Sequence, residues 1–597
     1  MRRALLWSFI ADALVQVIFI VLGVDETLRI WASGILACGV FFLVGAERSL
    51  SLLYPISLGI FLQVIISGAV HPIVAVFAGS GAFVATILAY PRESFKSERG
   101  LKQGVLFVVG YLLVTRAFLA SSLNLLAQEA YYWKYAENLS LSYLDHPPLV
   151  AWSIALGTAL FGDTEWGVRC MALVWWGLAA VYVWRLAALL YDRRAAWSAV
   201  GLFSVLPYFA GAGFIMSPEA PLLFFWAAAL YYSVNLLLTG ESRWWVGITF
   251  TIGGGLLAKY PMALFLIALG IALLFVRRAR RWLFRWEPYA AAVGIFVLFS
   301  PVLMWNIEHD WASFRFQGPE RMESTQQFSF HLLVLHVLVI LTPIGIRYFV
   351  VWIRETWLKR LAPDMDKIVL APFLLTPLAV FIFFSFSHEV KINWTGPVFL
   401  AILPFLGFTL SKECLEGRRA WLMTIAALLI AVGISMSYFT TGIPGIPYSK
   451  KLQRFVGSRI LVRELSQVED NLRRERGADV VVVGMDKYNT GSLVGFYRAN
   501  LAHERGEAKP MPTVGRHLFG GNSLSFQFWS SQTDFRGKTL LLVSIYERDL
   551  NDAIVGQFAR IEEPPTALIA MRGSSIVGRL YYRVVYDYQP EKPAGDS

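Results

Sequence analysis

The sequence predicts an all-α membrane protein that crosses the bilayer many times and ends in a small soluble α/β domain. Three observations support this prediction. Of the 597 residues, 56% are hydrophobic and only 16% are charged, whereas soluble domains contain about 25% charged residues. The apolar residues lie in blocks of about 17–22, each long enough to cross a hydrocarbon core of about 30 Å as a helix. After Tyr438 these blocks stop and mixed polar sequence follows.

About fifteen apolar blocks qualify as transmembrane helices by this length criterion. They cover residues 4–23, 28–45, 50–68, 71–90, 103–120, 167–190, 195–213, 219–238, 244–258, 261–276, 288–304, 331–350, 368–386, 394–410 and 420–438. A polar, aromatic stretch at 121–165 interrupts the series, and we expect it to be a loop. In the tail, the strand-like runs Val480–Val483 and Leu540–Val543 alternate with helical and loop-like segments, which is typical of an α/β domain.

These boundaries divide the chain into four predicted parts. They are a four-helix transmembrane module at 1–90, a basic cytoplasmic linker at 91–102, a transmembrane core at 103–440 and an external soluble domain at 441–597. The apolar stretch after Met1 is followed at once by further apolar blocks, so we interpret it as a retained first helix rather than a signal peptide.

The lysines and arginines predict the orientation of the chain. Clusters such as 92–102, 277–285 and 412–419 fall in loops on one side of the bilayer when the amino terminus is placed in the cytoplasm, as the positive-inside rule requires. The net charge of +11 therefore reflects membrane topology rather than nucleic-acid binding. An odd number of crossings places the carboxy-terminal domain outside. The three cysteines show no ligand spacing, so neither a disulfide framework nor a zinc site is expected.

The same topology places most of the unusual polar motifs in the external loops. These motifs are Gln128–Trp133, Tyr143–Pro148, Ser217–Glu219, Lys259–Tyr260, Trp305–Trp311 and His388–Trp394. Ionisable groups near membrane depth are costly and are usually functional. Acidic, basic and aromatic residues that meet at one water–lipid boundary suit a substrate with a charged head and an apolar tail.

Several of these motifs resemble a known family. Glu129-Ala-Tyr-Tyr-Trp133 and Asp145-His-Pro-Pro-Leu149 are similar to the first external loop of GT-C fold glycosyltransferases, in the bacterial branch related to lipid A aminoarabinose transferases and protein O-mannosyltransferases (glycosyltransferase families 39 and 83). Pro218–Leu222, Leu257–Pro261 and Trp305–Gln317 resemble later motifs of that group, so the resemblance covers about 103–440. It implies a GT-C-like multi-pass protein of the bacterial inner membrane with its site on the periplasmic side.

The resemblance also implies an activity, namely inverting transfer of one sugar from a polyprenyl-phosphate carrier to lipid A, another glycolipid or a protein. No nucleic acid is expected as a partner. The competing hypothesis is a transporter or flippase of a lipid-linked sugar. Transporter sites lie near the bilayer midplane between internal repeats, whereas the polar motifs here gather at one face.

The resemblance suggests roles for individual residues. The family loop begins Asp-Glu, with the aspartate as the base, but here the pair is Gln128-Glu129. An amide is not a useful proton acceptor, so either Glu129 takes the role, with Asp145 as second candidate, or an already anionic acceptor needs no strong base. Cations aimed at the departing phosphate would stabilise its growing charge. The candidates for binding the donor phosphate or substrate are His146, Lys259, Tyr260, Arg169, Glu219, Tyr131 and Tyr132.

Simpler structural explanations stay open for each of these residues. Glu129 could orient the neighbouring aromatic residues, Asp145 could cap a turn, and Lys259 could extend to the lipid interface. Glu308-His309 resembles a family position proposed near a metal, with Asp145 as a possible partner of His309, but two ligands are too few to define a site. No cofactor is required by any motif, and a divalent metal is left open. In the tail, 486–489 and 517–522 either face the site or cap the membrane domain.

Overall fold

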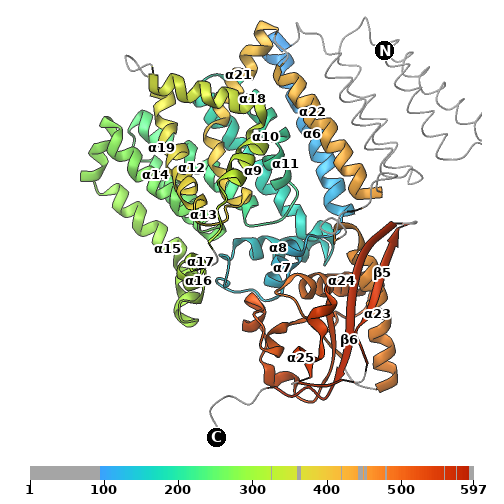
Figure 1. Cartoon of the computed structure of the whole chain (residues 1–597). Coiled ribbons are helices and arrows are strands. Elements are labelled where there is room, and N and C mark those ends of the chain that lie inside the picture. Colours follow the sequence, from blue (N-terminus) through green and yellow to red (C-terminus); the bar gives the residue numbers. More distant parts are fainter. Residues whose placement is uncertain are drawn as a thin grey trace, which may run out of the picture.

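The computed structural model describes residues 95–590 apart from 324–325, 359–364, 418–419, 442–447, 449–453, 477–479, 557, 562 and 573–574. The predicted four-helix module at 1–90 therefore lies outside the described residues. The described chain forms a helical domain and a smaller α/β domain, with a short buried helix between them (Figure 1).

The helical domain contains every apolar block predicted after residue 102. Its main helices are α6 (Glu98–Ser122), α9 (Glu165–Leu190), α10 (Arg193–Val205), α11 (Pro207–Ala212), α12 (Glu219–Thr239), α13 (Trp244–Ala258), α14 (Met262–Phe275), α15 (Glu287–Glu308), α18 (Phe330–Leu358), α19 (Met365–Ser385), α21 (Leu403–Glu416) and α22 (Ala420–Thr441). Shorter elements join them: η1 (Arg277–Phe284), α16 (Ala312–Gln317), α17 (Pro319–Met322), α20 (Ile392–Thr395) and η2 (Gly396–Ala401).

The predicted number of spans is confirmed only in part. Among the described residues, five helices are long and apolar enough to cross a membrane, or up to seven if each bent pair counts as one span. The block at 195–213 forms two helices, of 13 and 6 residues, instead of one. The break falls at Pro207, because the proline nitrogen has no hydrogen to donate to a backbone carbonyl. Helices α13 and α14 have 15 and 14 residues, fewer than the roughly 20 that a straight span needs. The prediction of a multi-pass membrane protein is nevertheless confirmed.

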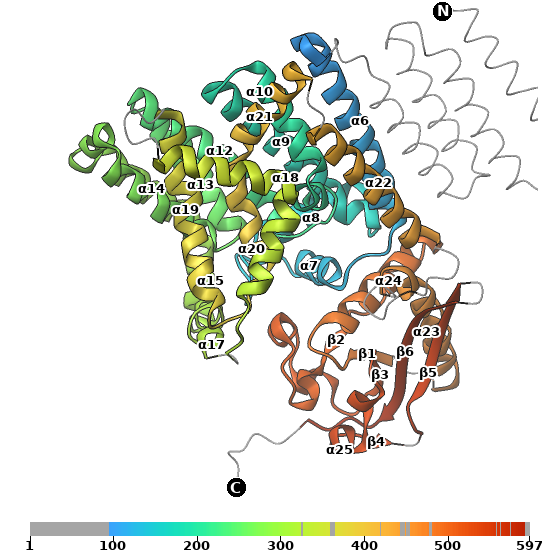
Figure 2. The same cartoon turned by 45° about the horizontal axis from the view of Figure 1, so that its top comes forward.

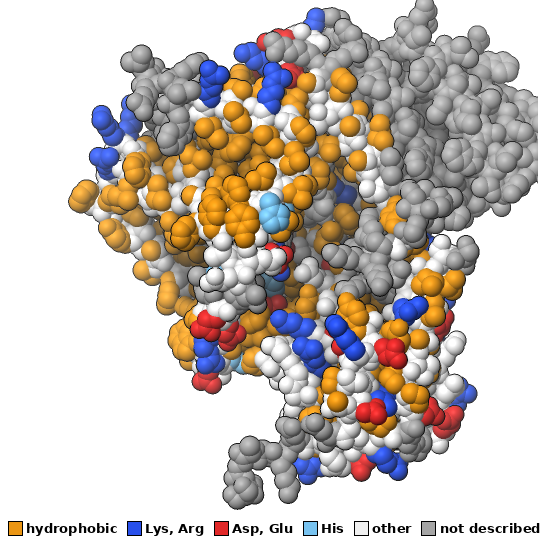
Figure 3. All heavy atoms as spheres, in the orientation of Figure 1, with side chains coloured by type: hydrophobic (Ala, Val, Ile, Leu, Met, Phe, Trp, Pro, Cys, Tyr) orange, Lys and Arg blue, Asp and Glu red, His pale blue; other side chains and the backbone are white. Residues whose placement is uncertain are grey.

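Charge is distributed over the helical domain as the orientation argument expects. In Figure 3, hydrophobic side chains cover the middle of this domain, and Lys and Arg side chains gather at its end away from the α/β domain. The exposed arginines of η1 lie at such a helix end. Local capping fixes several helix starts, because the side chains of Ser97, Thr164 and Asp192 each accept a backbone N–H from the first turn.

The stretch 121–165, predicted as a loop, contains two helices. Helix α7 (Ala127–Glu137) and helix α8 (Leu149–Phe161) lie between the end of α6 and the start of α9. Both views place α7 between the helical domain and the α/β domain (Figures 1 and 2). Most of its side chains are buried, including those of Glu129 and Lys134. Their polar groups must therefore be paired within the protein.

The α/β domain contains a six-stranded mixed sheet in the order β2-β1-β3-β6-β4, with β5 paired to β6. The strands are β1 (Val480–Gly484), β2 (Val514–Gly515), β3 (Thr539–Ser544), β4 (Arg560–Ile561), β5 (Thr566–Arg572) and β6 (Ser575–Tyr586). Strands β1 and β3 pair in parallel, and β3 and β6 antiparallel. The two strand-like runs in the sequence are the buried strands β1 and β3, which confirms the predicted α/β character.

Helices α23 (Arg454–Arg476) and α24 (Asn489–Arg505) complete this domain, and α24 packs on α7. The Tyr497 hydroxyl accepts a hydrogen bond from the backbone N–H of Leu125 at 2.8 Å. The Asn500 side chain donates to the carbonyl of Asp163 at 2.9 Å. The Lys509 ammonium group bridges Glu137 and Asp163 at 2.7 and 2.9 Å. The α/β domain is therefore docked on the 121–165 segment by buried and charged contacts.

We predict that Tyr497→Phe destabilises this docking. The substitution leaves the buried N–H of Leu125 without its acceptor, which costs about 1–3 kcal/mol, so the Tm of the detergent-purified protein should fall. Tyr546→Phe, at a side chain of the same domain that is 48% exposed, is the matched control and should leave Tm unchanged. Equal Tm values for the two variants would contradict the prediction.

Candidate active site

The most fully enclosed charge near the predicted site is Glu129, in the first turn of α7. The Arg169 guanidinium donates to it from Nε at 2.8 Å and from Nη2 at 2.6 Å. The backbone N–H groups of Leu126 and Met216 each donate to the same carboxylate at 3.0 Å. The side chains of Glu129 and Arg169 are 0% and 1% exposed. Four donors therefore surround this carboxylate.

Arg169 connects this pair to the end of α6. Its Nη1 donates to the carbonyls of Ala120 and Leu123 at 3.2 and 2.7 Å, and its Nη2 to that of Asn124 at 3.0 Å. Together with the two bonds to Glu129, these use the five donors of a guanidinium group. This geometry favours a structural role for both residues. Base catalysis by Glu129 and phosphate binding by Arg169 stay predictions that the hydrogen bonding does not favour.

Asp145 differs from Glu129 because it is partly open. Its side chain is 14% exposed, and its Oδ1 accepts hydrogen bonds from the hydroxyls of Tyr131, at 3.1 Å, and Tyr135. Tyr135 was not among the predicted site residues. The sequence did hold a signal for it, because positions four apart on a helix share one face and Tyr131 and Tyr135 both lie in α7.

The α7 tyrosines remain protonated donors. Burial, and then the negative charge of Asp145, raise the pKa of both Tyr131 and Tyr135 well above the usual value. Burial also raises the pKa of Tyr132, followed by the charges of Glu219 and Asp145. The Tyr132 hydroxyl lies 3.2 Å from Nε2 of His146, and that nitrogen lies 4.0 Å from Oδ2 of Asp145. The structure thus brings Tyr131, Tyr132, Asp145 and His146 together.

Lys259 and Glu219 form a second buried pair beside this cluster. Glu219, in the first turn of α12, accepts hydrogen bonds from the Lys259 ammonium group and, at 2.6 Å, from the side-chain amide of Asn393. Lys259 follows the last residue of α13 and is 4% exposed, so it points into the protein rather than to the lipid interface. The next residue, Tyr260, shares a hydrogen bond with Ser313 at 2.7 Å.

His309 lies in a different environment. Its Nδ1 is 2.8 Å from the backbone carbonyl of Trp305, and its ring stacks on the Trp305 indole at 4.1 Å between centroids. Across the part of the chain that the structure describes, no group of three or more His, Cys, Asp or Glu side chains could hold a metal ion. The described geometry therefore offers no support for a site built on Asp145 and His309.

The α/β domain contributes directly to the tyrosine cluster. The backbone N–H of Ser525 donates to the Tyr131 hydroxyl at 3.1 Å, and the Tyr488 ring lies 4.7 Å from that of Tyr131. Tyr488 belongs to the predicted segment 486–489, whereas nothing in the sequence indicated Ser525. His517, in the predicted segment 517–522, has its ring buried within the domain, where it pairs with the Ser530 carbonyl at 3.1 Å. Only tertiary contacts show that Tyr488 and Ser525 reach the tyrosine cluster, whereas the His517 ring pairs within its own domain.

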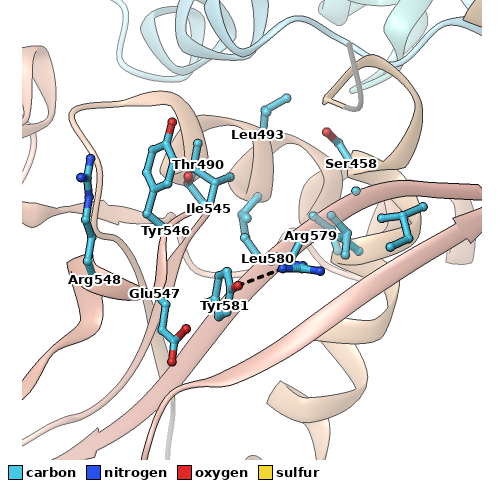
Figure 4. A pocket seen from close by; sticks show the side chains of 15 residues that line it. Ser458, Thr490, Leu493, Ile545, Tyr546, Glu547, Arg548, Arg579, Leu580 and Tyr581 are labelled. Atoms are coloured by element: carbon cyan, nitrogen blue, oxygen red, sulfur yellow. Dashed lines mark hydrogen bonds between the residues drawn. The ribbon is translucent and has the colours of Figure 1, made fainter. Parts of the chain in front are cut away.

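A further cavity, of about 770 Å³, lies within the α/β domain between α23, α24 and β6 (Figure 4). Tyr546, Arg548, Arg579 and Tyr581 stand around it, and Arg579 donates a long 3.4 Å hydrogen bond to the Tyr581 hydroxyl. None of the predicted site residues lines it, so it is separate from the α7 cluster.

Over part of its length the chain is similar to known membrane glycosyltransferases. Residues 145–305 match the family model described as dolichyl-phosphate-mannose-protein mannosyltransferase. This match includes Asp145, His146, Glu219 and Lys259, and it confirms the predicted family resemblance.

Two curated relatives illustrate which proteins the chain is similar to. The chain is 30% identical over 223 residues to the lipid A galacturonosyltransferase RgtD of Rhizobium johnstonii, covering 35% of this chain and 44% of the relative. It is 28% identical over 331 residues to the undecaprenyl phosphate-α-4-amino-4-deoxy-L-arabinose arabinosyl transferase of Pseudomonas paraeruginosa, covering 50% of this chain and 57% of the relative. The matched part thus spans about half the length of these curated relatives.

Solved structures show the fold. ArnT from Cupriavidus metallidurans superposes with a TM-score of 0.55 in its apo state and 0.56 when bound to undecaprenyl phosphate, at 13% and 15% identity. Each comparison covers 82% of this chain and 99% of ArnT. The arrangement of a helical membrane domain with a carboxy-terminal α/β domain is therefore the ArnT fold.

We predict that Glu129→Gln destabilises the protein. The substitution leaves the Arg169 charge buried without its counter-charge, and breaking a buried pair in this way costs about 3–5 kcal/mol, so Tm should fall sharply. Asp145→Asn is the matched control because Asp145 is partly exposed and an asparagine still accepts from the two tyrosines. An unchanged Tm for Glu129→Gln would contradict the structural role.

Proposed function

We propose that the chain is an inverting glycosyltransferase that moves a single sugar from a polyprenyl-phosphate carrier to lipid A or a related glycolipid, on the extracytoplasmic face of the bacterial inner membrane. The names of the relatives support the donor and the acceptor. The observation that carries the proposal is the partly open Asp145-His146 pair. The α7 tyrosines hold it where the helical domain meets the α/β domain.

The donor phosphate lies near His146 in this proposal. During transfer, the bond between the anomeric carbon and the phosphate oxygen breaks while an acceptor oxygen bonds to the opposite face of that carbon. The phosphate leaves with increased negative charge, and a protonated His146 and the Tyr132 hydroxyl next to it stabilise that charge. Lys259 lies beside this cluster, but its charge is balanced by Glu219, and Asn393 binds the same carboxylate.

Asp145 is the better candidate for the base. A hydroxyl acceptor must lose its proton as it attacks, and a positioned carboxylate takes that proton. Asp145 is partly exposed, whereas Glu129 is enclosed by four donors. We therefore assign Glu129 and Arg169 to positioning, since they fix the start of α7 and with it the tyrosines that contact Asp145. The roles of Glu129 and Asp145 are thus reversed relative to the order that the family motif suggested.

The flippase hypothesis gains no comparable support. Transporter sites lie near the bilayer midplane. The cluster here lies instead at the end of the helical domain that contacts the soluble domain, as the hydrogen bond between Ser525 and Tyr131 shows.

We predict that Asp145→Asn lowers sugar transfer by about 10²–10⁴-fold, since it removes a general base, while the protein keeps its Tm. The measurement is a single-turnover assay with purified protein, a polyprenyl-phosphate sugar and lipid A. Glu129→Gln, assayed at a temperature where it remains folded, should retain more activity than Asp145→Asn. Parental activity in Asp145→Asn would remove Asp145 from catalysis. If the protein in vesicles translocates the lipid-linked sugar but transfers no sugar to lipid A, the flippase hypothesis is favoured.

We predict that His146→Ala weakens binding of undecaprenyl phosphate by about tenfold, because a charge-assisted contact to the phosphate is lost. The measurement is a thermal-shift titration of the purified protein with undecaprenyl phosphate. His503→Ala, at an exposed position of α24, is the control and should bind like the parent. Equal affinities for the two variants would place the phosphate elsewhere.

A further inference from the structure

Two adjoining cavities lie between the helical domain and the α/β domain, next to the α7 cluster. Their volumes are about 530 and 500 Å³, and both are lined by His309 and Phe528. Their walls come from the segments 137–144, 305–320 and 522–529, which we call together the interdomain cleft. Phe528 is 38% exposed, so this aromatic ring is available to a ligand.

The cleft combines aromatic faces with neutral polar groups. The aromatic side chains are Tyr143, Trp305, Phe316, Phe528 and Trp529. The amides and hydroxyls are Asn138, Ser140, Ser142, Asn522, Ser525 and Gln527. Sugar rings have one apolar C–H face and a rim of hydroxyls, so they suit a site where aromatic faces alternate with donors and acceptors. This composition fits a sugar better than an acyl chain.

Charge restricts which sugar the cleft accepts. Glu308, Asp310 and Glu320 line one cavity together with Arg315, and Lys487 lies over the ring of Phe316 at 6.0 Å. Figure 3 shows acidic and basic side chains together at the lower end of the α15–α17 lobe. An excess of carboxylates repels a phosphate or a uronic acid and attracts an ammonium group. The cleft therefore suits an uncharged or amino-bearing ring.

Backbone strain marks the same place. Asp310, Trp311 and Leu524 have φ values of 51°, 59° and 51°, in the left-handed region that side chains other than glycine disfavour. Asp310 lines the cleft, and Leu524 lies between the lining residues Asn522 and Ser525. Strained backbone persists where the surrounding structure maintains it, and it concentrates at functional sites. Both walls of the cleft, from different domains, carry such strain.

The cleft is also continuous with the proposed base. Leu144, which lines it, precedes Asp145, and the side chain of Gln317, next to Phe316, donates to the Asp145 carbonyl. From the opposite wall, Ser525 donates to the Tyr131 hydroxyl, which in turn donates to Asp145. A sugar in the cleft would therefore lie beside the carboxylate that is proposed to take the acceptor proton.

We propose that the interdomain cleft binds an uncharged or amino-bearing sugar ring, and that the 522–529 segment of the α/β domain selects it. This inference rests on the proposed transferase function. The ring has two sources with the same chemistry: the sugar on the polyprenyl phosphate, and a saccharide unit of the acceptor. Phe528 packs against the ring, Asn522 and Gln527 bind its hydroxyls, and Glu308 and Glu320 discriminate by charge.

The test compares Phe528→Ala with Tyr546→Ala, a control at an exposed aromatic residue of the same domain outside the cleft. The substrates are undecaprenyl phosphate-α-4-amino-4-deoxy-L-arabinose and lipid A, with KM measured for each. We expect Phe528→Ala to raise one KM by about tenfold, with plain undecaprenyl phosphate binding unchanged. A raised donor KM places the donor sugar in the cleft, and a raised acceptor KM places an acceptor saccharide there. Parental KM values for both substrates would overturn the inference.

A second variant tests the charge argument. Glu308→Gln combined with Glu320→Gln should reduce the preference for free 4-amino-4-deoxy-L-arabinose over galacturonate, measured by saturation-transfer NMR on the full-length protein. This binding readout needs no turnover. Failure of the parent to transfer sugar to lipid A would therefore count against the proposed function alone. Failure of the parent to prefer the amino sugar would overturn the inference.

Discussion

The buried pair of Glu129 and Arg169 is the interaction on which the arrangement of the site depends. The guanidinium group binds the end of α6, the linking segment and the first turn of α7 at once. Burying two charges costs free energy, and a pair of this kind often adds little net stability. In this structure the pair ties the first turn of α7 to the end of α6.

The position of α7 in turn determines how the two domains meet. One side of the helix presents tyrosine hydroxyls to Asp145 and His146, and α24 of the soluble domain packs against it. Ser525 contacts the same Tyr131 that binds Asp145. A shift of the soluble domain would therefore disturb the hydrogen bonds of Asp145, the proposed base. The carboxy-terminal domain is thereby in direct contact with the tyrosine cluster.

Lys259 and His146 differ in how far the protein encloses them. Lys259 is buried in contact with Glu219 and Asn393, whereas His146 is 18% exposed. The carboxylate of Glu219 balances the charge of Lys259, and the contacts hold the lysine in place. Of the predicted donor-binding residues, Lys259 is therefore enclosed within the protein, whereas His146 is partly exposed.

The sequence by itself determined the apolar blocks, the α/β tail and the external motifs, because periodicity, hydropathy and charge bias are local properties of the chain. It also indicated Asp145 and His146, which are adjacent. Only the tertiary structure decided that Glu129 is enclosed by Arg169 and that Ser525 joins the site. These outcomes depend on which groups meet across 40 to nearly 400 residues of chain, and no local pattern encodes such encounters.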